Sequence, residues 1–327
     1  MLNGINYLNC NSSNHSTSFV SLFRKEPEKY HMNIQKGINT KEKVNIYNQT
    51  LRRKIIDEFE KNQSDIFIIS GEDLTYFTYE EVRNLYNFLK NYFECIKVIA
   101  YVREPISFID SETQQRILGG VTFKELENNP ALPHYKFRFE KYFKYFGRND
   151  VKLFLFDRNK LYKQNVVYDF LYNIGANRDV LENIKCKNTN SSFSKDTIYF
   201  IEKLNRLYPL YVDNKLNNLR GNLNRDLLRE AERENECEKF TAPRTFNNSD
   251  LEYLNQDIDY VNQFLDIEEK VPNIKSIKNT IHETCRLNDE YLIKLINVLN
   301  LKVQERDEKV KQLKTRLREE QLKDNNS

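Results

Sequence analysis

The 327-residue chain has no tryptophan, two methionines, eight glycines and seven prolines. It contains no run of 18 apolar residues, and its amino terminus has no basic region followed by an apolar segment, as a signal peptide would have. We therefore expect a cytoplasmic protein without a transmembrane segment. Its five scattered cysteines form no CxxC motif, which argues against a disulfide framework or a zinc site. Charges nearly balance, 51 basic against 48 acidic residues, which argues against general nucleic-acid binding.

What the chain does contain is an alternation of short β-branched segments with segments of helical spacing. This pattern is typical of an α/β domain with a parallel sheet and helices on both faces. After residue 187 no further strand is expected. The predicted strands cover 5–10, 65–70, 96–102 and 151–156, and the predicted helices cover 19–23, 40–62, 78–93, a segment from Pro105, 121–129, 134–146, 166–174, 194–207, 217–236 and 250–264.

The sequence predicts an α/β domain over 1–270, a linker over 271–285 and a helical tail over 286–327. In this tail apolar residues repeat every seven positions, which favours a short coiled coil that lets the chain self-associate through 286–323. The alternative is a single solvated helix without a partner. The first apolar position of the repeat is occupied by Ile296, Val303, Val310 and Leu317. The second is occupied by Leu292, Leu299 and Leu313, and is interrupted by Arg306 and Glu320.

The segment CIKVIAYVREPISFIDS (95–111) joins an apolar strand to a helix. Arg103 ends the strand, and Ser111 lies about two turns into the helix at a rise of about 1.5 Å per residue. A guanidinium and a hydroxyl placed in this way can hold one phosphate at the carboxyl end of the strand, where open α/β sheets bind ligands. Alternatively, Arg103 pairs with Glu104 or Asp110, and Ser111 is an ordinary polar residue.

The pattern YVREPISFIDS, with the order of elements around it, resembles the sulfotransferases that use 3'-phosphoadenosine 5'-phosphosulfate (PAPS), in particular bacterial ones that act on polysaccharides. In that family the arginine and the serine bind the 3'-phosphate of the donor, which implies this role for Arg103 and Ser111. The resemblance covers about residues 5–266. It implies a P-loop-like, three-layer fold with a mostly parallel sheet, and sulfuryl transfer from PAPS to a carbohydrate or polysaccharide hydroxyl without a metal.

The first loop, NCNSSNHSTSF (9–19), departs from this family. There a sequence of the type Lys-Ser/Thr-Gly-Thr-Thr binds the 5'-phosphosulfate at a helix amino terminus, and its lysine touches the bridging oxygen. In this chain Ser13 stands in the place of the lysine and His15 in that of the glycine. The family's hydroxyl positions correspond to Ser16, Thr17 and Ser18.

His15 is the candidate that supplies a positive charge or a proton in place of the lysine, although an unperturbed imidazole is mostly neutral at pH 7. The charge can alternatively come from elsewhere in the chain. The other candidates are Arg24, Lys25 and a residue of the carboxyl-terminal helices, where Arg244 lies in the region of the family's late nucleotide loop.

The candidate base is Glu72 in IFIISGEDL (66–74), because carbohydrate sulfotransferases can carry a catalytic glutamate or histidine just past this strand. A carboxylate can remove the acceptor's proton if burial raises its pKa toward the working pH. Asp73 is the second choice, and the competing interpretation is that either residue caps the following turn.

Aromatic faces and cations suit an anionic sugar, so four residues are candidates for an acceptor groove, although such a stripe is more commonly core. The altered loop also supports a second hypothesis, a degenerate sulfotransferase-like scaffold that binds a nucleotide or partner without turnover. A kinase or nucleotide hydrolase is disfavoured because GxxxxGK[ST] is absent. The groove candidates are Arg116, His134, Tyr135 and Arg138.

Overall fold

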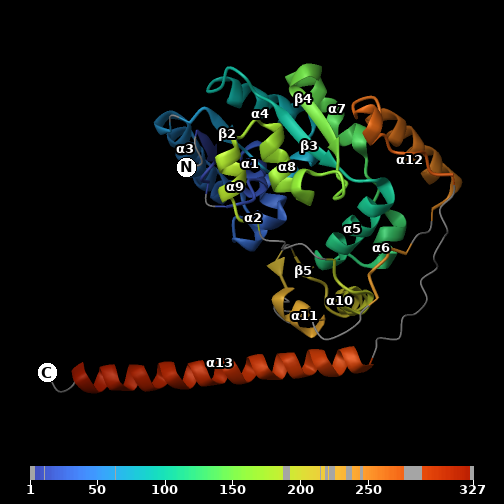
Figure 1. The fold of residues 1–327 in the computed structure, drawn as a ribbon. Helices are drawn as coiled ribbons and strands as arrows, with labels where there is room; N and C mark the ends of the chain where they lie inside the picture. The colour runs from blue at the N-terminus through green and yellow to red at the C-terminus, as the bar shows by residue number, and fades with distance from the viewer. Residues whose placement is uncertain are drawn as a thin grey trace.

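Two pairs of short parallel strands lie among helices in the computed structural model (Figure 1). In the first pair β1 (Ile5–Tyr7) runs beside β2 (Ile66–Ile68), and in the second β3 (Val98–Val102) runs beside β4 (Val151–Leu155). The parallel pairing is as predicted, but the single predicted sheet is divided into two ladders. The structure describes residues 4–10, 12–62, 64–186, 192–213, 215–217, 220, 225–232, 238–243, 246–275 and 289–324.

The helices follow the predicted pattern closely because local signals mark their ends. Thr78 and Glu81, for example, form the predicted capping box at the start of α4. The helices are α1 (Ser16–Phe23), α2 (His31–Gln35), α3 (Lys41–Lys61), α4 (Tyr79–Lys90), α5 (Pro105–Leu118), α6 (Phe123–Asn128), α7 (Tyr135–Phe146), α8 (Val166–Asn173), α9 (Arg178–Asn183), α10 (Lys195–Leu207), α11 (Arg225–Glu232), α12 (Asn248–Val261) and α13 (Asp289–Asp324). Short 3-10 turns are η1 (Pro27–Lys29), η2 (Glu72–Tyr76), η3 (Arg148–Asp150), η4 (Tyr162–Gln164) and η5 (Ile267–Glu269).

One expectation for the second half of the chain was wrong, and another is confirmed only in part. A small antiparallel pair, β5 (Tyr211–Val212) and β6 (Lys215–Leu216), follows α10 where no strand was predicted. Strands of two residues are too short to produce an alternating pattern that sequence reasoning can detect. The helix predicted over 217–236 is described only as α11, and several residues on either side of α11 lie outside the described part of the chain.

One hydrophobic core joins both strand pairs to the helices. It contains Leu8 beyond β1, Val102 of β3 and Leu153 of β4, together with Ile55 of α3 and Ile198 of α10. The two ladders therefore share their packing although no ladder hydrogen bond connects them among the described strands.

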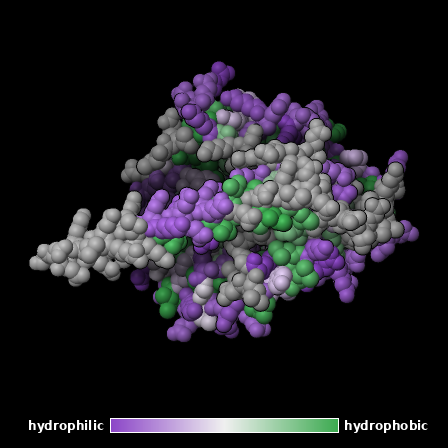
Figure 2. Space-filling model, turned by 90° about the horizontal axis from the view of Figure 1, so that it is seen from below, coloured by the Kyte–Doolittle hydropathy of each residue, from purple (hydrophilic) through white to green (hydrophobic). Residues whose placement is uncertain are grey.

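The tail is one 36-residue helix, α13, whose described side chains Leu292 and Leu295 pack against the rest of the chain near the start of the helix. Leu295 is 4% exposed and packs in the same core as Leu228 and Ala231 of α11. Figure 1 shows the later turns extending away below the molecule, and Figure 2 looks onto that side, where hydrophobic side chains lie among hydrophilic ones. The described part of the predicted 271–285 linker, residues 271–275, contains no helix or strand.

Helix α3 offers a test of this core with two isoleucines in opposite environments. Ile55 is fully buried, whereas Ile46 is 64% exposed. We expect Ile55→Ala to lower the free energy of unfolding by about 2–5 kcal/mol, because the lost packing leaves a cavity. The matched change Ile46→Ala is expected to stay within about 0.5 kcal/mol of wild type. Urea denaturation measures both, and equal effects would contradict this burial.

Candidate functional site

The carboxyl ends of β3 and β4 bring Arg103 and Phe156 together. Val102 is paired with Leu155, and the N–H of Phe156 donates to the carbonyl of Val102 at 2.7 Å. The next residue of each strand therefore lies at the same edge. The guanidinium of Arg103 lies over the Phe156 ring, 5.0 Å from its centre.

Arg103 is not taken up by the two carboxylates that the sequence offered as ion-pair partners. Glu104 accepts hydrogen bonds from the first N–H groups of α5, at 3.0 and 2.9 Å, and so caps that helix. Asp110 accepts one from the backbone N–H of Ala242 at 2.9 Å. The half-buried guanidinium thus lies against an aromatic face, and its N–H groups form no hydrogen bond or ion pair with the described residues.

A second arginine adds to the positive charge at this edge. Arg158 follows β4 and is exposed. Burial lowers the pKa of Arg103, Glu72 raises it, and the charge of Arg158 contributes a smaller lowering. Ser111 lies half-buried in the second turn of α5. Two guanidinium groups near one another favour an anion between them. Sequence reasoning missed Arg158, although its position just past a strand parallel to β3 was a usable signal.

Glu72, at the start of η2, lies among charges of both signs. Solvent reaches its side chain, but many protein atoms surround the carboxylate, and the resulting loss of hydration raises its pKa. Asp73 and Glu112 raise this pKa further, whereas Arg138 and Arg103 lower it. Because solvent reaches the group, it can exchange protons, and because the shift is upward, it is a better base near neutral pH than an ordinary glutamate.

Asp73, the second candidate base, is engaged inside the protein. Its carboxylate accepts a hydrogen bond from the Tyr30 hydroxyl at 2.6 Å, and its N–H donates to the Ser16 hydroxyl at 3.0 Å. Asp73 therefore fixes η2 against α1 and is less available to a substrate than Glu72.

Helix α7 holds η2 in place through one face. The Arg138 guanidinium donates to the hydroxyls of Thr75 and Tyr76 at 3.0 and 2.7 Å, and the Lys141 ammonium donates to the carbonyl of Thr75 at 2.9 Å. The Tyr142 hydroxyl reaches the carbonyl next to it, at Leu74. Residues three and four apart share a helix face, so α7 presents all three donors to η2.

Lys141 is a buried cation without a carboxylate partner at ion-pair distance among the described side chains. It is 1% exposed, and burial, followed by the charge of Arg138, lowers its pKa to about 8. Its ammonium also donates to the carbonyl of Phe137 and lies 4.1 Å from the centre of that ring. These contacts compensate the lost hydration of the cation.

The environment of His15 argues against its predicted role as a replacement cation. The ring is fully buried, and burial lowers its pKa, although the Leu8 carbonyl favours the protonated form. Its Nδ1 accepts the N–H of Ser70 at 2.9 Å, which places the remaining proton on Nε2. His15 thus joins the loop to the end of β2 as a neutral ring. Arg24 and Lys25 follow α1 at its other end, about 12 Å away along the helix, and Arg244 lies outside the described residues.

Most polar groups of the first loop are already bonded within the protein. The N–H of Ser16 donates to the side-chain oxygen of Asn14 at 2.9 Å, so an amide takes the position expected for an anion at this helix terminus. The Ser16 hydroxyl accepts from η2, the Ser18 hydroxyl donates to Cys10, and Thr17 is buried. Ser13, at the lysine position, is exposed.

The first loop is also covered by the segment between β2 and η2, which approaches the start of α1 closely. A Cβ on Gly71 would lie 2.8 Å from the backbone nitrogen of Ser16, so the end of β2 and the start of α1 pack backbone against backbone. This is a close approach that only glycine allows. The two strand ends therefore differ: the polar groups of the loop are bonded within the protein, whereas the Arg103 guanidinium has no hydrogen bond or ion pair with a described residue.

The four predicted acceptor-groove residues are engaged in contacts within the protein. Tyr135 and Arg138 are buried, and Arg138 serves η2. Arg116 pairs with Glu112 at 2.9 Å, and His134 bonds the Tyr253 hydroxyl at 2.6 Å. Arg116 and Arg138 are linked through Glu112 and the Tyr76 hydroxyl, which lies in η2 with Glu72.

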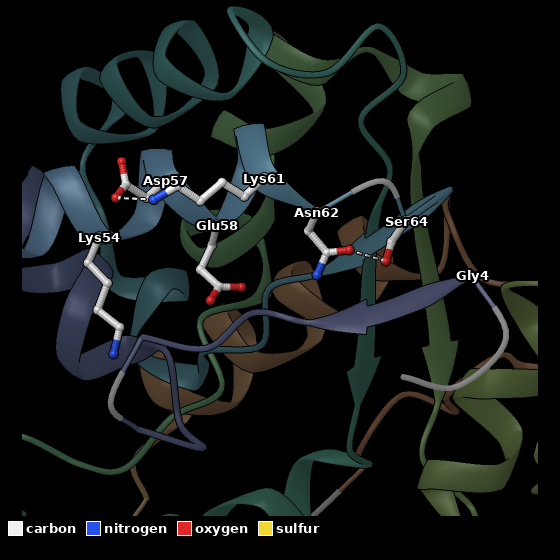
Figure 3. A pocket seen from close by; sticks show the side chains of 7 residues that line it. All are labelled: Gly4, Lys54, Asp57, Glu58, Lys61, Asn62 and Ser64. Atoms are coloured by element: carbon white, nitrogen blue, oxygen red, sulfur yellow. Dashed lines mark hydrogen bonds and ion pairs between the residues drawn. The ribbon is translucent and has the colours of Figure 1, made fainter.

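A cavity of about 820 Å³ lies away from this edge, where β1 and β2 begin (Figure 3). Gly4 and Ser64 mark the starts of the two strands, and Lys54, Glu58 and Lys61 of α3 form its wall. Figure 3 shows Lys61 turned to Asp57, with which it forms an ion pair at 2.8 Å. Because ligands of parallel sheets bind at the carboxyl ends of the strands, size alone does not make this cavity the site.

Comparisons with known proteins identify no relative. No protein-family model matches the chain, and neither a curated protein nor a solved structure matches it. Within the described ranges no group of three His, Cys, Asp or Glu residues is arranged to hold a metal ion. Every helix in the described part of the chain is too short or too polar to cross a bilayer.

Proposed function

We propose that the protein binds PAPS and transfers its sulfuryl group to a carbohydrate hydroxyl. The observation that supports this most strongly is that an exposed glutamate of raised pKa and the Arg103 guanidinium, which follow β2 and β3, lie near enough for the charge of each to shift the pKa of the other. Arg103, Ser111 and Arg158 hold the 3'-phosphate, and Glu72 takes the proton of the acceptor hydroxyl as its oxygen attacks sulfur. The bond from sulfur to the bridging oxygen then breaks, and adenosine 3',5'-bisphosphate leaves.

Donor binding tests the first half of this proposal. Calorimetry with adenosine 3',5'-bisphosphate is expected to give micromolar binding by wild type and at least about tenfold weaker binding by Arg103→Ala, because a charge-assisted bond to the 3'-phosphate is lost. Arg148→Ala is the matched control, since Arg148 also lies over a phenylalanine ring, 4.9 Å from the centre of Phe264. A folded wild type that does not bind would refute the proposal.

A second candidate is a protein that binds the nucleotide without turnover. It is favoured by the first loop, where Asn14 occupies the Ser16 N–H and His15 is buried and neutral. Transition-state stabilisation at the bridging oxygen then has no cation from this loop. The two candidates share donor binding and differ in the need for a base.

Glu72→Gln separates the two candidates, because the amide preserves size and removes the base. We expect unchanged binding of the bisphosphate and a decrease of about 10²–10⁴-fold in transfer of labelled sulfate from PAPS to polysaccharide. In wild type, kcat/KM should increase as pH rises through the Glu72 pKa, which lies above the usual glutamate value. Glu80→Gln, an exposed change on α4, is the control. Donor binding without any transfer by wild type would select the second candidate.

We also propose that α13 pairs in parallel with α13 of a second copy. The apolar seam beyond the docked first turns is open to solvent, with Ile296, Val303 and Val310 exposed by 55, 57 and 47%. Lys302 and Lys309 share one position of the repeat, beside the seam. In an antiparallel pair this position of one helix faces the same position of the other, so the lysines of the two copies would repel each other. In a parallel pair Lys302 instead faces Asp307 of the second copy.

Sedimentation equilibrium tests this pairing. The full chain is expected to be dimeric, and the double variant Val303→Lys, Val310→Lys monomeric, because two charges would enter the seam. Leu301→Lys is the control, since Leu301 is 57% exposed on the same helix but lies outside the seam. A monomeric wild type, or a Leu301→Lys variant that dissociates equally, would contradict the pairing.

A further inference from the structure

A groove of about 580 Å³ lies between α7, α12 and the start of α4, a size typical of ligand sites. Figure 1 shows α7 and α12 side by side, away from α13. Neither the donor site nor the predicted acceptor residues use this groove. Its walls contain four aromatic rings, those of Tyr79, Phe137, Tyr253 and Tyr260.

The rings come from three different helices and leave much of their surface in solvent. Tyr79, Phe137 and Tyr253 are exposed by 39, 53 and 38%. Their positions are fixed from behind: the Tyr253 hydroxyl bonds His134 at 2.6 Å, and Lys141 lies under the Phe137 ring. Rigid aromatic faces that stay exposed around a concave surface favour a flat ligand with an apolar side.

The charged groups of the groove are already partnered within the protein. Glu140 lies 4.0 Å from the Lys136 ammonium and accepts the Tyr79 hydroxyl. Asp257 accepts two N–H groups at the start of α7, at 2.6 and 2.8 Å, and Asp259 accepts the Asn273 amide at 3.2 Å. Lys136 is offset by Glu140, whereas Asp257 and Asp259 accept only from neutral N–H groups, so no cation among the described residues is paired with them and an anionic ligand is disfavoured. A ligand with hydroxyl groups can still use the remaining lone pairs of the carboxylates and the side-chain amide of Gln263.

From these observations we infer that the groove binds a neutral glycan chain. The apolar faces of the sugar rings stack on the exposed aromatic faces, and the hydroxyl groups bond to the carboxylate and amide groups between them. Neutral sugars fit because the carboxylates without a paired cation disfavour an anionic ligand and can still accept hydrogen bonds from sugar hydroxyl groups.

The groove begins at Thr78 and Tyr79, just after η2, and Glu72 lies at the other end of η2. Five residues of 3-10 helix span about 10 Å, a distance that a chain of a few sugar rings can cover. The inference therefore deepens the proposed function by giving the acceptor a place. It rests on that function only for the claim that the bound glycan is the acceptor.

Binding is tested with immobilised maltohexaose, cellohexaose, xylohexaose and chitohexaose, with heparin as the anionic comparison. Wild type is expected to bind at least one neutral oligosaccharide more tightly than heparin. Phe137→Ala and, separately, Tyr253→Phe address the groove: the first should weaken binding at least tenfold by removing a stacking face, and the second should weaken it less because the ring remains. Tyr172→Ala, a change to a tyrosine that is 59% exposed on α8, should bind as wild type.

The same variants distinguish this inference from the proposed function. Phe137→Ala should bind adenosine 3',5'-bisphosphate as wild type does, because Phe137 is 53% exposed in the groove and the α7 residue that bonds Arg103 is Tyr135. Glycan binding without bisphosphate binding would support the groove assignment and refute the proposed sulfuryl transfer. Failure of wild type to bind any of the four neutral oligosaccharides, a preference for heparin, or unchanged binding by Phe137→Ala would overturn the groove assignment.

Discussion

The contact between α7 and η2 is the constraint on which the rest of the site depends. Arg138, Lys141 and Tyr142 are buried, and together they donate to three consecutive residues of η2. Buried cations are costly unless every donor finds an acceptor, so this contact tolerates little displacement. Asp257 of α12 in turn caps α7 through two N–H groups. The position of Glu72 therefore follows from a chain of contacts that runs from α12 through α7 to η2.

This arrangement also sets the charge at the site. Glu72 lies near two carboxylates and two guanidinium groups, and its pKa is raised because burial and the carboxylates prevail. Arg103 is oriented by an aromatic ring and not by a carboxylate, which leaves its N–H groups for an anion. The proposed base and the proposed anion-binding group thus lie near each other past the ends of β2 and β3, and the charge of each shifts the pKa of the other.

The first loop and the Arg103 edge show how similar sequence signals can lead to different surroundings. Both combine a strand end with a helix start and hydroxyl side chains. In the first loop, Asn14 and the backbone of η2 occupy the groups that could bind an anion. A short amide can satisfy a helix N–H locally, so a polar loop of this kind can close on itself. At Arg103 the capping group is Glu104, which binds the helix and leaves the arginine free.

The sequence by itself determined the elements and their order. Periodicity and capping act over a few residues, so α3, α4, α7 and the parallel partners β3 and β4 were predictable. It also located Glu72 and Arg103 just past their strands. The tertiary structure alone decided that His15 is a buried neutral ring, that Arg158 joins the Arg103 edge, and that four aromatic residues border one groove. These outcomes depend on burial and on contacts between segments far apart in the chain, which local patterns do not encode.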